Sequence, residues 1–583
     1  MEIESREVAH TEVGLRPARN ERLADTLVDV LVSAGLEIVF GIPGGAVSPI
    51  HDALMSRPEV RVVTSRHESG AMFAAAGYAR ATEKLGVVLV TSGPGVLSAL
   101  NGLASAACDS IPMLVIAGDV PRGKFGRGAL QDGSAYHLDI VRMTNSITKM
   151  AMEVRDPAAA VPMLKLAMET ALSGRRGPVL LTLPIDVGMA PAPVPLIGFE
   201  KGTPSRAENA TLEYAATLLA ESERPLILAG SGTRWGEGPT ELRHLAELLQ
   251  VPVVTTPKGK GILPEDHPLS LGVFGFGGHP SAARYLAEGV DTLFVVGSSL
   301  GEVATDGFSP LISEAKDLVQ LDVDPLSVGR AYPVRLGLIG DAALTMRELT
   351  RKVKRRMGPK LRDPKVFGVV HHENVAVVGD GPEGAIQPHR VIHELQTILP
   401  RDTIYTSDIG EHLLYAIHYV RAFAPDSFCV MTGLGSMGSG IGASLGQKLA
   451  TPKRPVVAIC GDGCFSMGFG DVATAARERI PILVVVLNDE RYGMVEIGHE
   501  SVYGRRPPYP AGPMDVVKLA RGVGASAMRI DHTGDILHAA RDIEAMLAEG
   551  PVVLDVRIDR TTRMPKNGRN EVLSKGAMKR AFN

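Results

Sequence analysis

The sequence predicts an α/β protein built from three doubly wound parallel-sheet domains. Short apolar, β-branched runs alternate with helical patterns along most of the chain, and many of these runs end at a glycine-rich loop. Such alternation is typical of parallel strands that are connected by helices. A chain of 583 residues is also too long to fold around one hydrophobic core.

Two proline-containing stretches, residues 191–204 and 351–384, divide the chain and predict linkers. We therefore expect an N-terminal domain at residues 20–194, a central domain at 205–355 and a C-terminal domain at 385–560. The residues before position 20 are charged and lack the apolar segment of a signal peptide. The basic residues after position 560 predict a tail that either folds over the rest of the protein or stays disordered.

Composition excludes several classes of function. The formal net charge is only −4 with both signs mixed, which favours neither nucleic acid nor an anionic membrane as a partner. No apolar run approaches the length of a membrane span. The four cysteines show no CxxC pattern, which is typical of a protein in the reducing cytoplasm.

The N-terminal domain begins with a helix at residues 23–34, which Gly35 ends as a C-cap would. Its expected strands lie at residues 38–40, 60–64, 87–91, 113–117 and 179–183. The first leads into Gly44 and Gly45, the second into Glu68 at the head of a helix, and the third into Pro94. A glutamate in the first turn of a helix gains from the helix dipole, and that alone could explain Glu68.

The central domain repeats the pattern, with strands expected at residues 225–229, 251–255, 292–296 and 318–322. Gly230-Ser231-Gly232 follows the first of these strands and is by itself only a weak nucleotide-binding cue. No strand carries a full GxGxxG with a downstream acid, which argues against an NAD-binding protein.

The C-terminal domain holds the stretch around which the chain is organised. Buried strands are expected at residues 403–406, 456–460 and 482–487, and the last two are joined by a helix. A turn at Gly461-Asp462-Gly463 ends one strand, and Asn488-Asp489 ends the next. Because parallel strands meet at one sheet edge, Asp462 and Asp489 should lie together there. Two carboxylates beside glycine amides suit a hard cation that holds a phosphate.

This spacing resembles the thiamine-diphosphate signature, in which GDG is followed at a set distance by an Asn-Asn pair. The resemblance implies that Mg²⁺ and the diphosphate are held by Asp462, Asp489 and the main-chain carbonyl of Arg491. Asp489 stands where asparagine is usual, which makes the cage one charge more negative. An ordinary βαβ unit with a glycine turn remains the alternative.

Longer motifs resemble the acetohydroxyacid (acetolactate) synthase large subunit. They are Phe40–Val47, Arg66-His67-Glu68, Gly77–Thr82 and Thr91–Gly95 in the N-terminal domain. The resemblance implies that Glu68 hydrogen-bonds N1′ of the aminopyrimidine and is catalytic, and that Gly44, Gly45 and Pro94 contact the cofactor. Gln131 resembles a glutamine beside the reacting carbons and is a second candidate catalytic residue; a polar loop residue is the alternative.

The same resemblance implies the diphosphate-side contacts. The cofactor-binding candidates are Gly410, Glu411, His412, Gly435, Met437, Gly461, Asp462, Gly463, Cys464, Asp489, Tyr492, Gly493 and Met494. Met437 would prop the cofactor in a bent shape, although a core methionine would look the same. Glu411 replaces the family's glutamine, and an acid near a diphosphate should point away or be paired. Gly498 stands where the synthases place a tryptophan, so the acceptor pocket should differ in shape.

Related enzymes hold FAD in the central domain, with an arginine-containing stretch after the third strand. Here the stretch is Gly297–Glu302 and has no arginine, so the sequence favours a domain without FAD and leaves a flavin open. Pyruvate decarboxylases use adjacent histidines, but the pair here, His371 and His372, lies in the linker and reads as a solvated feature.

The resemblance thus implies an enzyme that decarboxylates a pyruvate-like 2-oxo acid and ligates the product to an acceptor. It also implies a homodimer or homotetramer in which Glu68 of one subunit faces Asp462 of another. A simple 2-oxo-acid decarboxylase or aldehyde lyase, a flavin-dependent pyruvate oxidase, and a non-catalytic paralogue remain open. The donor and the acceptor are not identified by the sequence.

Overall fold

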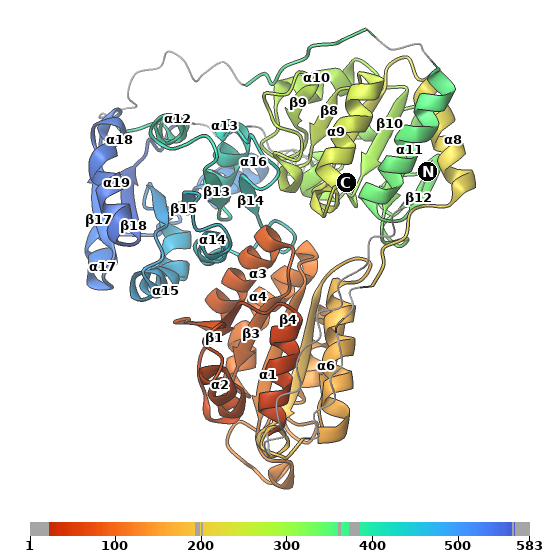
Figure 1. Ribbon diagram of the computed structural model, residues 1–583. Helices are drawn as coiled ribbons and strands as arrows, with labels where there is room; N and C mark the ends of the chain where they lie inside the picture. The colour runs from red at the N-terminus through yellow and green to blue at the C-terminus, as the bar shows by residue number, and fades with distance from the viewer. Residues whose placement is uncertain are drawn as a thin grey trace, which may run out of the picture.

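A computed structural model describes residues 22–192, 199, 202–358, 363–371, 385–562 and 565. Almost all of the expected tail after residue 560 lies outside the described residues. His372 also lies outside them. The chain forms three α/β domains, each with a six-stranded sheet in which all neighbouring strands are parallel. Figure 1 shows the N-terminal domain below, the central domain at the upper right and the C-terminal domain at the left.

The N-terminal and C-terminal sheets share one topology. Their strand orders are β2-β1-β3-β4-β6-β5 and β14-β13-β15-β16-β18-β17, which are the same order counted from the first strand of each domain. The central sheet, β12-β11-β10-β7-β8-β9, has the 3-2-1-4-5-6 order of doubly wound dinucleotide-binding folds. Helices connect most of the successive strands of each sheet, because parallel strands need a long crossover between them.

The strands of the N-terminal sheet are β1 Ile38–Gly41, β2 Arg61–Thr64, β3 Gly86–Val90, β4 Met113–Asp119, β5 Met150–Glu153 and β6 Pro178–Pro184. Those of the central sheet are β7 Leu226–Ala229, β8 Val253–Thr255, β9 Ser270–Val273, β10 Thr292–Val296, β11 Asp317–Asp322 and β12 Leu336–Ile339. Those of the C-terminal sheet are β13 Ile404–Ser407, β14 Phe428–Val430, β15 Val456–Gly461, β16 Leu483–Asn488, β17 Ser526–Ile530 and β18 Val552–Arg557.

The N-terminal helices are α1 Leu23–Ser33, α2 Ser48–Met55, α3 Glu68–Thr82, α4 Pro94–Asp109, α5 Ile140–Thr144, α6 Pro157–Leu172 and α7 Ile185–Gly188. The central helices are α8 Asn209–Glu221, α9 Gly238–Leu249, α10 Pro280–Ala287 and α11 Ala342–Met357. The C-terminal helices are α12 Pro388–Ile398, α13 Glu411–Tyr419, α14 Ser439–Ala450, α15 Asp462–Glu478, α16 Gly493–Tyr503, α17 Val516–Gly522, α18 Asp535–His538 and α19 Ala540–Glu549.

Two local expectations are wrong. The stretch Gly461-Asp462-Gly463 is not a separate turn, because β15 continues through Gly461 and α15 begins at Asp462. The second linker does not begin at residue 351, since α11 runs to Met357 and packs its apolar face on the central core. Its basic last turn, which suggested a linker, instead faces the negative end of the helix dipole.

The N-terminal and C-terminal domains are joined by a close contact between α3 and α14. A methyl group at Gly77 would lie 2.1 Å from the carbonyl oxygen of Ala443, and one at Gly446 would lie 1.8 Å from that of Ala74. Glycine at these places lets the two helix backbones approach directly. The resulting core cluster contains side chains of both domains, among them Phe73, Ile441 and Phe465.

Histidines join the central and C-terminal domains near the end of α13. The Nε2 atom of buried His279 and the Nδ1 atom of His371 both lie about one hydrogen bond from the carbonyl oxygen of His418, at 2.9 and 3.0 Å. His371 is therefore a contact between domains, and its expected role as a solvated linker residue is wrong. No helix among the described residues is both long and apolar enough to cross a membrane.

Candidate active site

The candidate residues of the N-terminal domain gather at the carboxyl ends of β1, β2 and β3. Thr91 is the centre of this group: a methyl group at Gly44 would lie 2.6 Å from its Cβ, and one at Gly95 would lie 2.9 Å from its Cγ2. The same position on Gly95 is 3.6 Å from Oε1 of Glu68. Glu68 is half-buried at the first position of α3, after His67, whose Nδ1 accepts a hydrogen bond from the Ser69 amide.

Gly45 and Pro94 lie at the same edge of the sheet. Gly45 begins the short 3₁₀ turn Gly45–Val47 after β1, and Pro94 is the first residue of α4, where a missing N–H costs nothing. Gly93, just before it, has a φ of +61°, a conformation that favours glycine.

Gln131 lies against this glycine. A methyl group on Gly93 would be 3.3 Å from both Cα and Cβ of Gln131, and Gln131 itself has a φ of +63°. Asp119, at the end of β4, holds the two loops together: its Oδ1 accepts hydrogen bonds from Ser92 Oγ at 3.1 Å and from the Gly133 amide at 3.0 Å. The structure therefore brings Glu68, Gln131 and the glycine loops of this domain into one group.

The second group lies at the carboxyl edge of the C-terminal sheet. Gly461 pairs with Leu487 in register, so Asp462 and Asp489 follow neighbouring strands directly. Asp462 is 3% exposed and Asp489 is 8% exposed. Burial, and next the charge of Asp489, raise the pKa of Asp462 to about 7. Its Oδ2 atom is buried and has no hydrogen-bond partner among the described residues.

Arg491 contributes a side chain that the sequence did not suggest. Its Nε donates to Oδ2 of Asp489, and its guanidinium also pairs with Glu496 at 3.3 Å. The cation offsets the extra negative charge of Asp489, although burial still leaves the pKa of Asp489 above its usual value. The expected metal ligand is the main-chain carbonyl of Arg491. The amide of the next residue, Tyr492, donates a hydrogen bond to the Tyr509 carbonyl at 2.8 Å, which holds this turn in place.

Glu411 is paired, as one of the two expected outcomes required, but it does not point away from the site. Its Oε2 lies close to Gly493, since a methyl group on Gly493 would be 2.3 Å from it. Its Oε1 accepts a hydrogen bond from Tyr415 Oη at 3.4 Å. Burial, and next the charge of Asp489, raise the pKa of Glu411 to about 7. The carboxyl therefore carries less than a full charge at neutral pH, which reduces its repulsion of a phosphate.

His412 lies beside the Gly461 end of β15. A methyl group on Gly461 would be 3.2 Å from its Nδ1, and Gly410 is similarly close to the ring. Burial lowers the pKa of His412 to about 4, so the imidazole is neutral. Its Nε2 is buried and lacks a partner among the described residues.

The glycine loop after β14 carries Met437 and is anchored by Asp408. The buried carboxylate of Asp408 accepts hydrogen bonds from the amides of Gly438 and Gly440, both at 2.9 Å. Gly435 and Gly438 have φ values of +78° and +80°, which the loop requires. Met437 Cε lies 3.5 Å from the position of a methyl group on Gly463.

Four helices begin at this edge: α13 at Glu411, α14 at Ser439, α15 at Asp462 and α16 at Gly493. Helix N-termini with free amides attract phosphate. Gly463 and Cys464 occupy the first turn of α15, where Cys464 Sγ donates to the Ile409 carbonyl at 3.0 Å. Tyr492 covers Gly463, since a methyl group there would be 2.6 Å from its ring, and Met494 follows Gly493 in the first turn of α16.

This donor set fits a diphosphate and one hard cation. Four helix N-termini supply positive partial charge, while a divalent ion would stabilise the carboxylates of Asp462, whose Oδ2 lacks a partner among the described residues, and of Asp489. No group of three or more His, Cys, Asp or Glu side chains within the described residues is arranged to hold a metal. Two carboxylates and a main-chain carbonyl are consistent with that finding.

Helix α15 connects the second group to the N-terminal domain. Its Asp471 lies against Gly70 of α3, and its Gly470 lies against Arg66, just before α3. Asp462 precedes Asp471 by nine residues on the same helix, about 14 Å at 1.5 Å per residue.

Thr91, Asp119 and Asp408 are site residues that the sequence reasoning did not select. Each lies at or directly after the end of a strand that leads into a loop with candidate site residues. Their position in the sequence could have identified them. Their side chains act on loop backbone, so their residue types alone suggest no cofactor chemistry.

Comparison with known proteins matches all three domains. Residues 21–139 match the description "Thiamine pyrophosphate enzyme, N-terminal TPP binding domain". Residues 212–349 match the central domain of the same enzymes, and residues 408–556 match their C-terminal TPP binding domain.

The chain is also similar to curated proteins over most of its length. It is 33% identical over 562 residues to a probable acetolactate synthase large subunit of Methanocaldococcus jannaschii, covering 93% of both chains. It is 33% identical over 571 residues to the acetolactate synthase large subunit of Corynebacterium glutamicum, covering 93% of this chain and 87% of the relative. The chloroplastic acetolactate synthase 1 of Oryza sativa is 33% identical over 563 residues, at 93% and 85% coverage.

Proposed function

The chain belongs to the thiamine pyrophosphate enzyme family, and we propose from that premise that it is an acetolactate synthase-like carboligase. It decarboxylates a 2-oxo acid such as pyruvate and joins the remaining acyl unit to a carbonyl acceptor. The observation that carries the proposal is that the chain contains both of the residue groups described above, which we call half-sites. One holds Glu68 among glycine loops, and the other holds Asp462 and Asp489 among helix N-termini.

Thiamine diphosphate held here would supply a nucleophilic carbon for a 2-oxo acid and an acceptor for the electrons left by the loss of CO₂. Glu68 holds or releases a proton at N1′ of the aminopyrimidine ring, from a position next to Gly95 and Thr91. Gln131, which lies against Gly93, orients the reacting groups from the loop that follows β4. Met437 would support the cofactor from the side of Gly463, and the amides at the start of α15 would bind its diphosphate.

Mg²⁺ is part of this proposal. Asp462, Asp489 and the carbonyl of Arg491 would hold it, with Arg491's own side chain balancing the charge of Asp489. The proposal also places the protein in a reducing cytoplasm, which the four free cysteines support.

A homodimer or larger homo-oligomer completes the site in this proposal, with Glu68 of one subunit facing Asp462 of another, as the family resemblance implies. Mixing Glu68→Gln protein with Asp462→Ala protein under subunit exchange should restore part of the activity that each variant lacks. Mixtures that stay inactive while subunits exchange would contradict a shared site.

FAD is not part of the proposed function. Gly230 and Gly232 follow β7 at the point where the central strand order reverses, a usual nucleotide position. However, methyl groups there would lie 2.4 and 2.9 Å from atoms of Gly297, so contact between the two loops accounts for these glycines. Flavin absorbance bands in the purified protein would overturn this and favour a pyruvate oxidase-type enzyme.

The deciding experiment incubates the protein with thiamine diphosphate, Mg²⁺ and pyruvate and identifies the product. Acetolactate supports the carboligase, whereas acetaldehyde alone supports a decarboxylase. Glu68→Gln should keep cofactor binding and lose most activity, while Glu59→Gln, an exposed glutamate of the same domain, should change neither. Near-normal turnover in Glu68→Gln would exclude the proposed role.

A further inference from the structure

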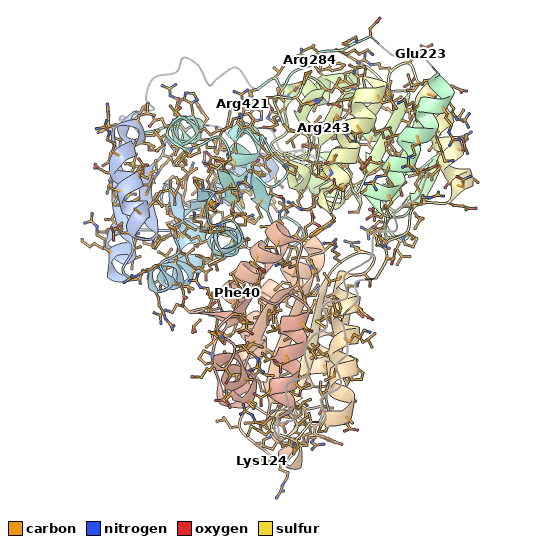
Figure 2. The ribbon with its side chains drawn as sticks, viewed as in Figure 1. Phe40, Lys124, Glu223, Arg243, Arg284 and Arg421 are labelled. Carbon is orange, nitrogen blue, oxygen red and sulfur yellow. The ribbon has the colours of Figure 1, made fainter. Side chains whose placement is uncertain are left out.

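The carboxylate of Asp109, the last residue of α4, lies where the three domains meet. In Figure 2 the N-terminal domain meets the other two at the end opposite Lys124. Oδ1 of Asp109 accepts a hydrogen bond from Nζ of Lys258 in the central domain at 2.9 Å and another from the amide of Gly433 in the C-terminal domain at 3.1 Å. One carboxylate oxygen therefore connects all three domains.

The ion pair between Asp109 and Lys258 is largely removed from solvent. The side chain of Asp109 is 3% exposed and that of Lys258 is 26% exposed. A buried carboxylate is costly unless a cation pairs with it, and Lys258 supplies that cation. The backbone of Lys258 is held in turn by Arg80 of α3, whose Nη2 donates to the carbonyl oxygens of Lys258 at 3.3 Å and of Phe428 at 3.1 Å. Because Phe428 begins β14, the cation lies on a segment that is fixed next to this strand.

The loop between β14 and α14, residues 431–438, is held against α4 at two points. A methyl group on Gly433 would be 2.8 Å from Oδ1 of Asp109, so the loop backbone lies directly against the end of this helix. About two turns earlier on α4, Oδ1 of Asn101 accepts a hydrogen bond from Oγ of Ser436. The N-terminal domain therefore fixes where this β14–α14 loop lies.

Met437 lies between fixed points of the β14–α14 loop. Ser436, before it, is held by α4, and Gly438, after it, is held by Asp408. The side chain of Met437 reaches α15, where its Cε is 3.5 Å from the position of a methyl group on Gly463. A shift of the loop would therefore move Met437 relative to the start of α15.

We propose that Asp109 and Lys258 are positioning residues for Met437. Lys258 orients the carboxylate of Asp109, and that carboxylate holds the β14–α14 loop through the Gly433 amide. The central domain, which carries none of the proposed cofactor contacts, thereby acts on the site. The effect on turnover rests on the proposed function, whereas the anchoring of the loop does not.

Hydrogen exchange at the Gly433 amide tests the anchoring on the resting full-length protein, without turnover. Mass spectrometry of the peptide that covers residues 431–438, with fragmentation, resolves this amide. Asp109→Ala should speed its exchange about 10- to 100-fold, because the amide loses a charged acceptor. Asp109→Asn keeps an acceptor oxygen and should be intermediate. Lys258→Met should speed exchange about 2- to 10-fold, since the carboxylate stays but loses the cation that orients it.

Two comparisons separate this role from general loosening of the domain contacts. A protein with both Asp109→Ala and Lys258→Met should exchange no faster than Asp109→Ala, because Lys258 acts through Asp109. Asp324→Asn is the matched control, since Asp324 pairs with Arg175 across the same two domains at 3.3 Å, and exchange at Gly433 should not change. Asp515→Asn, which alters an exposed helix cap of the C-terminal domain, is a second control.

The effect on turnover is measured as acetolactate formation with saturating thiamine diphosphate and Mg²⁺. Asp109→Ala and Lys258→Met should each lower kcat about 10-fold by letting Met437 shift, with little change in the Kd for thiamine diphosphate. Met437→Ala should lower kcat less than about 2-fold further when Asp109→Ala is already present, because both changes remove one support. A merely structural role would lower the melting temperature without this non-additivity.

Two outcomes overturn the proposal. Exchange at the wild-type rate in Asp109→Ala and Lys258→Met would show that the contact does not hold the loop. Faster exchange with unchanged kcat would show that the loop position does not matter to the reaction. If Asp109→Ala fails to fold, Asn101→Ala changes an exposed residue and should speed exchange of the same peptide. A wild type that forms no acetolactate would contradict the proposed function instead, and the exchange rates would still decide the anchoring.

Discussion

Asp462 and Asp489 directly follow neighbouring parallel strands, and the charge of Asp489 adds to burial in raising the pKa of Asp462 to about 7. Two buried carboxylates in this relationship repel each other unless a cation lies between them. Such a pair does not stabilise the fold by itself. It is therefore the feature of the second group that points most directly to a bound cation.

Removal of Asp462 should abolish tight binding of the metal. Loss of a residue that only hydrogen-bonds a metal ligand typically weakens metal binding about 10- to 100-fold. Asp462→Ala removes a proposed direct ligand and should therefore weaken Mg²⁺ binding by more than that. Titration of Mg²⁺ into protein with saturating thiamine diphosphate measures this, with Asp515→Asn as the control. Wild-type affinity in Asp462→Ala would show that the metal lies elsewhere.

The ion pair between Arg491 and Asp489 should appear in a double-mutant cycle. Arg491→Met should lower the free energy of unfolding by roughly 3 kcal/mol, since it leaves a buried carboxylate without its cation. In an Asp489→Asn background the same change should cost at least about 1 kcal/mol less. Thermal unfolding without added metal gives all four values, and additive effects would mean that the pair contributes nothing.

Asp408 should control the order of the loop that carries Met437. Asp408→Ala leaves the buried amides of Gly438 and Gly440 without acceptors, at about 1–3 kcal/mol each. We expect a lower melting temperature and faster proteolysis between residues 433 and 438. Asp408→Asn keeps one acceptor and should be intermediate; proteolysis of Asp408→Ala at the wild-type rate would contradict this role.

Met437 should affect turnover more than cofactor affinity. Met437→Ala removes the support opposite Gly463, and a misplacement of about 1 Å can lower a rate about 100-fold. We expect kcat to fall by about 10- to 100-fold while the Kd for thiamine diphosphate changes little. Met467 provides the control, because it is an exposed methionine beside the same loop and Met467→Ala should leave kcat unchanged.

Asp471 should make stability depend on pH. This carboxyl is buried between α3, α14 and α15, and burial, with the nearby charge of Asp408, raises its pKa to about 7. A raised carboxyl pKa gives stability that is complete below the unfolded value of 3.8 and is lost as pH rises to about 7.

Asp471→Asn removes this ionisation. The variant should therefore be more stable than the wild type above pH 7, by on the order of 2–4 kcal/mol, and the difference should shrink toward about pH 4. Melting temperatures of both proteins across this range provide the measurement. A difference that does not vary with pH would show that Asp471 does not titrate as a buried acid.

The interior strands could be predicted from the sequence, whereas the edge strands could not. Strands such as Thr292–Val296 are buried on both faces, so they appear in the sequence as nearly continuous apolar runs. Of the six edge strands only β2 was expected; β5, β9, β12, β14 and β17 were missed, as was the interior strand β18. Edge strands such as Met150–Glu153 are only partly buried and acquire strand structure from the neighbour they pair with.

Sequence alone determined that Glu68, Asp462 and Asp489 lie where a strand ends or a helix begins, because this depends on short-range spacing along the chain. Only the tertiary structure decided what surrounds them. The cation beside Asp489, the tyrosine on Glu411, the carboxylates of Asp119 and Asp408 that hold the loops, and the buried Asp471 all depend on contacts between elements distant in the chain. Spacing along one chain encodes local geometry, but the charge and burial of a group depend on which distant segments pack against it.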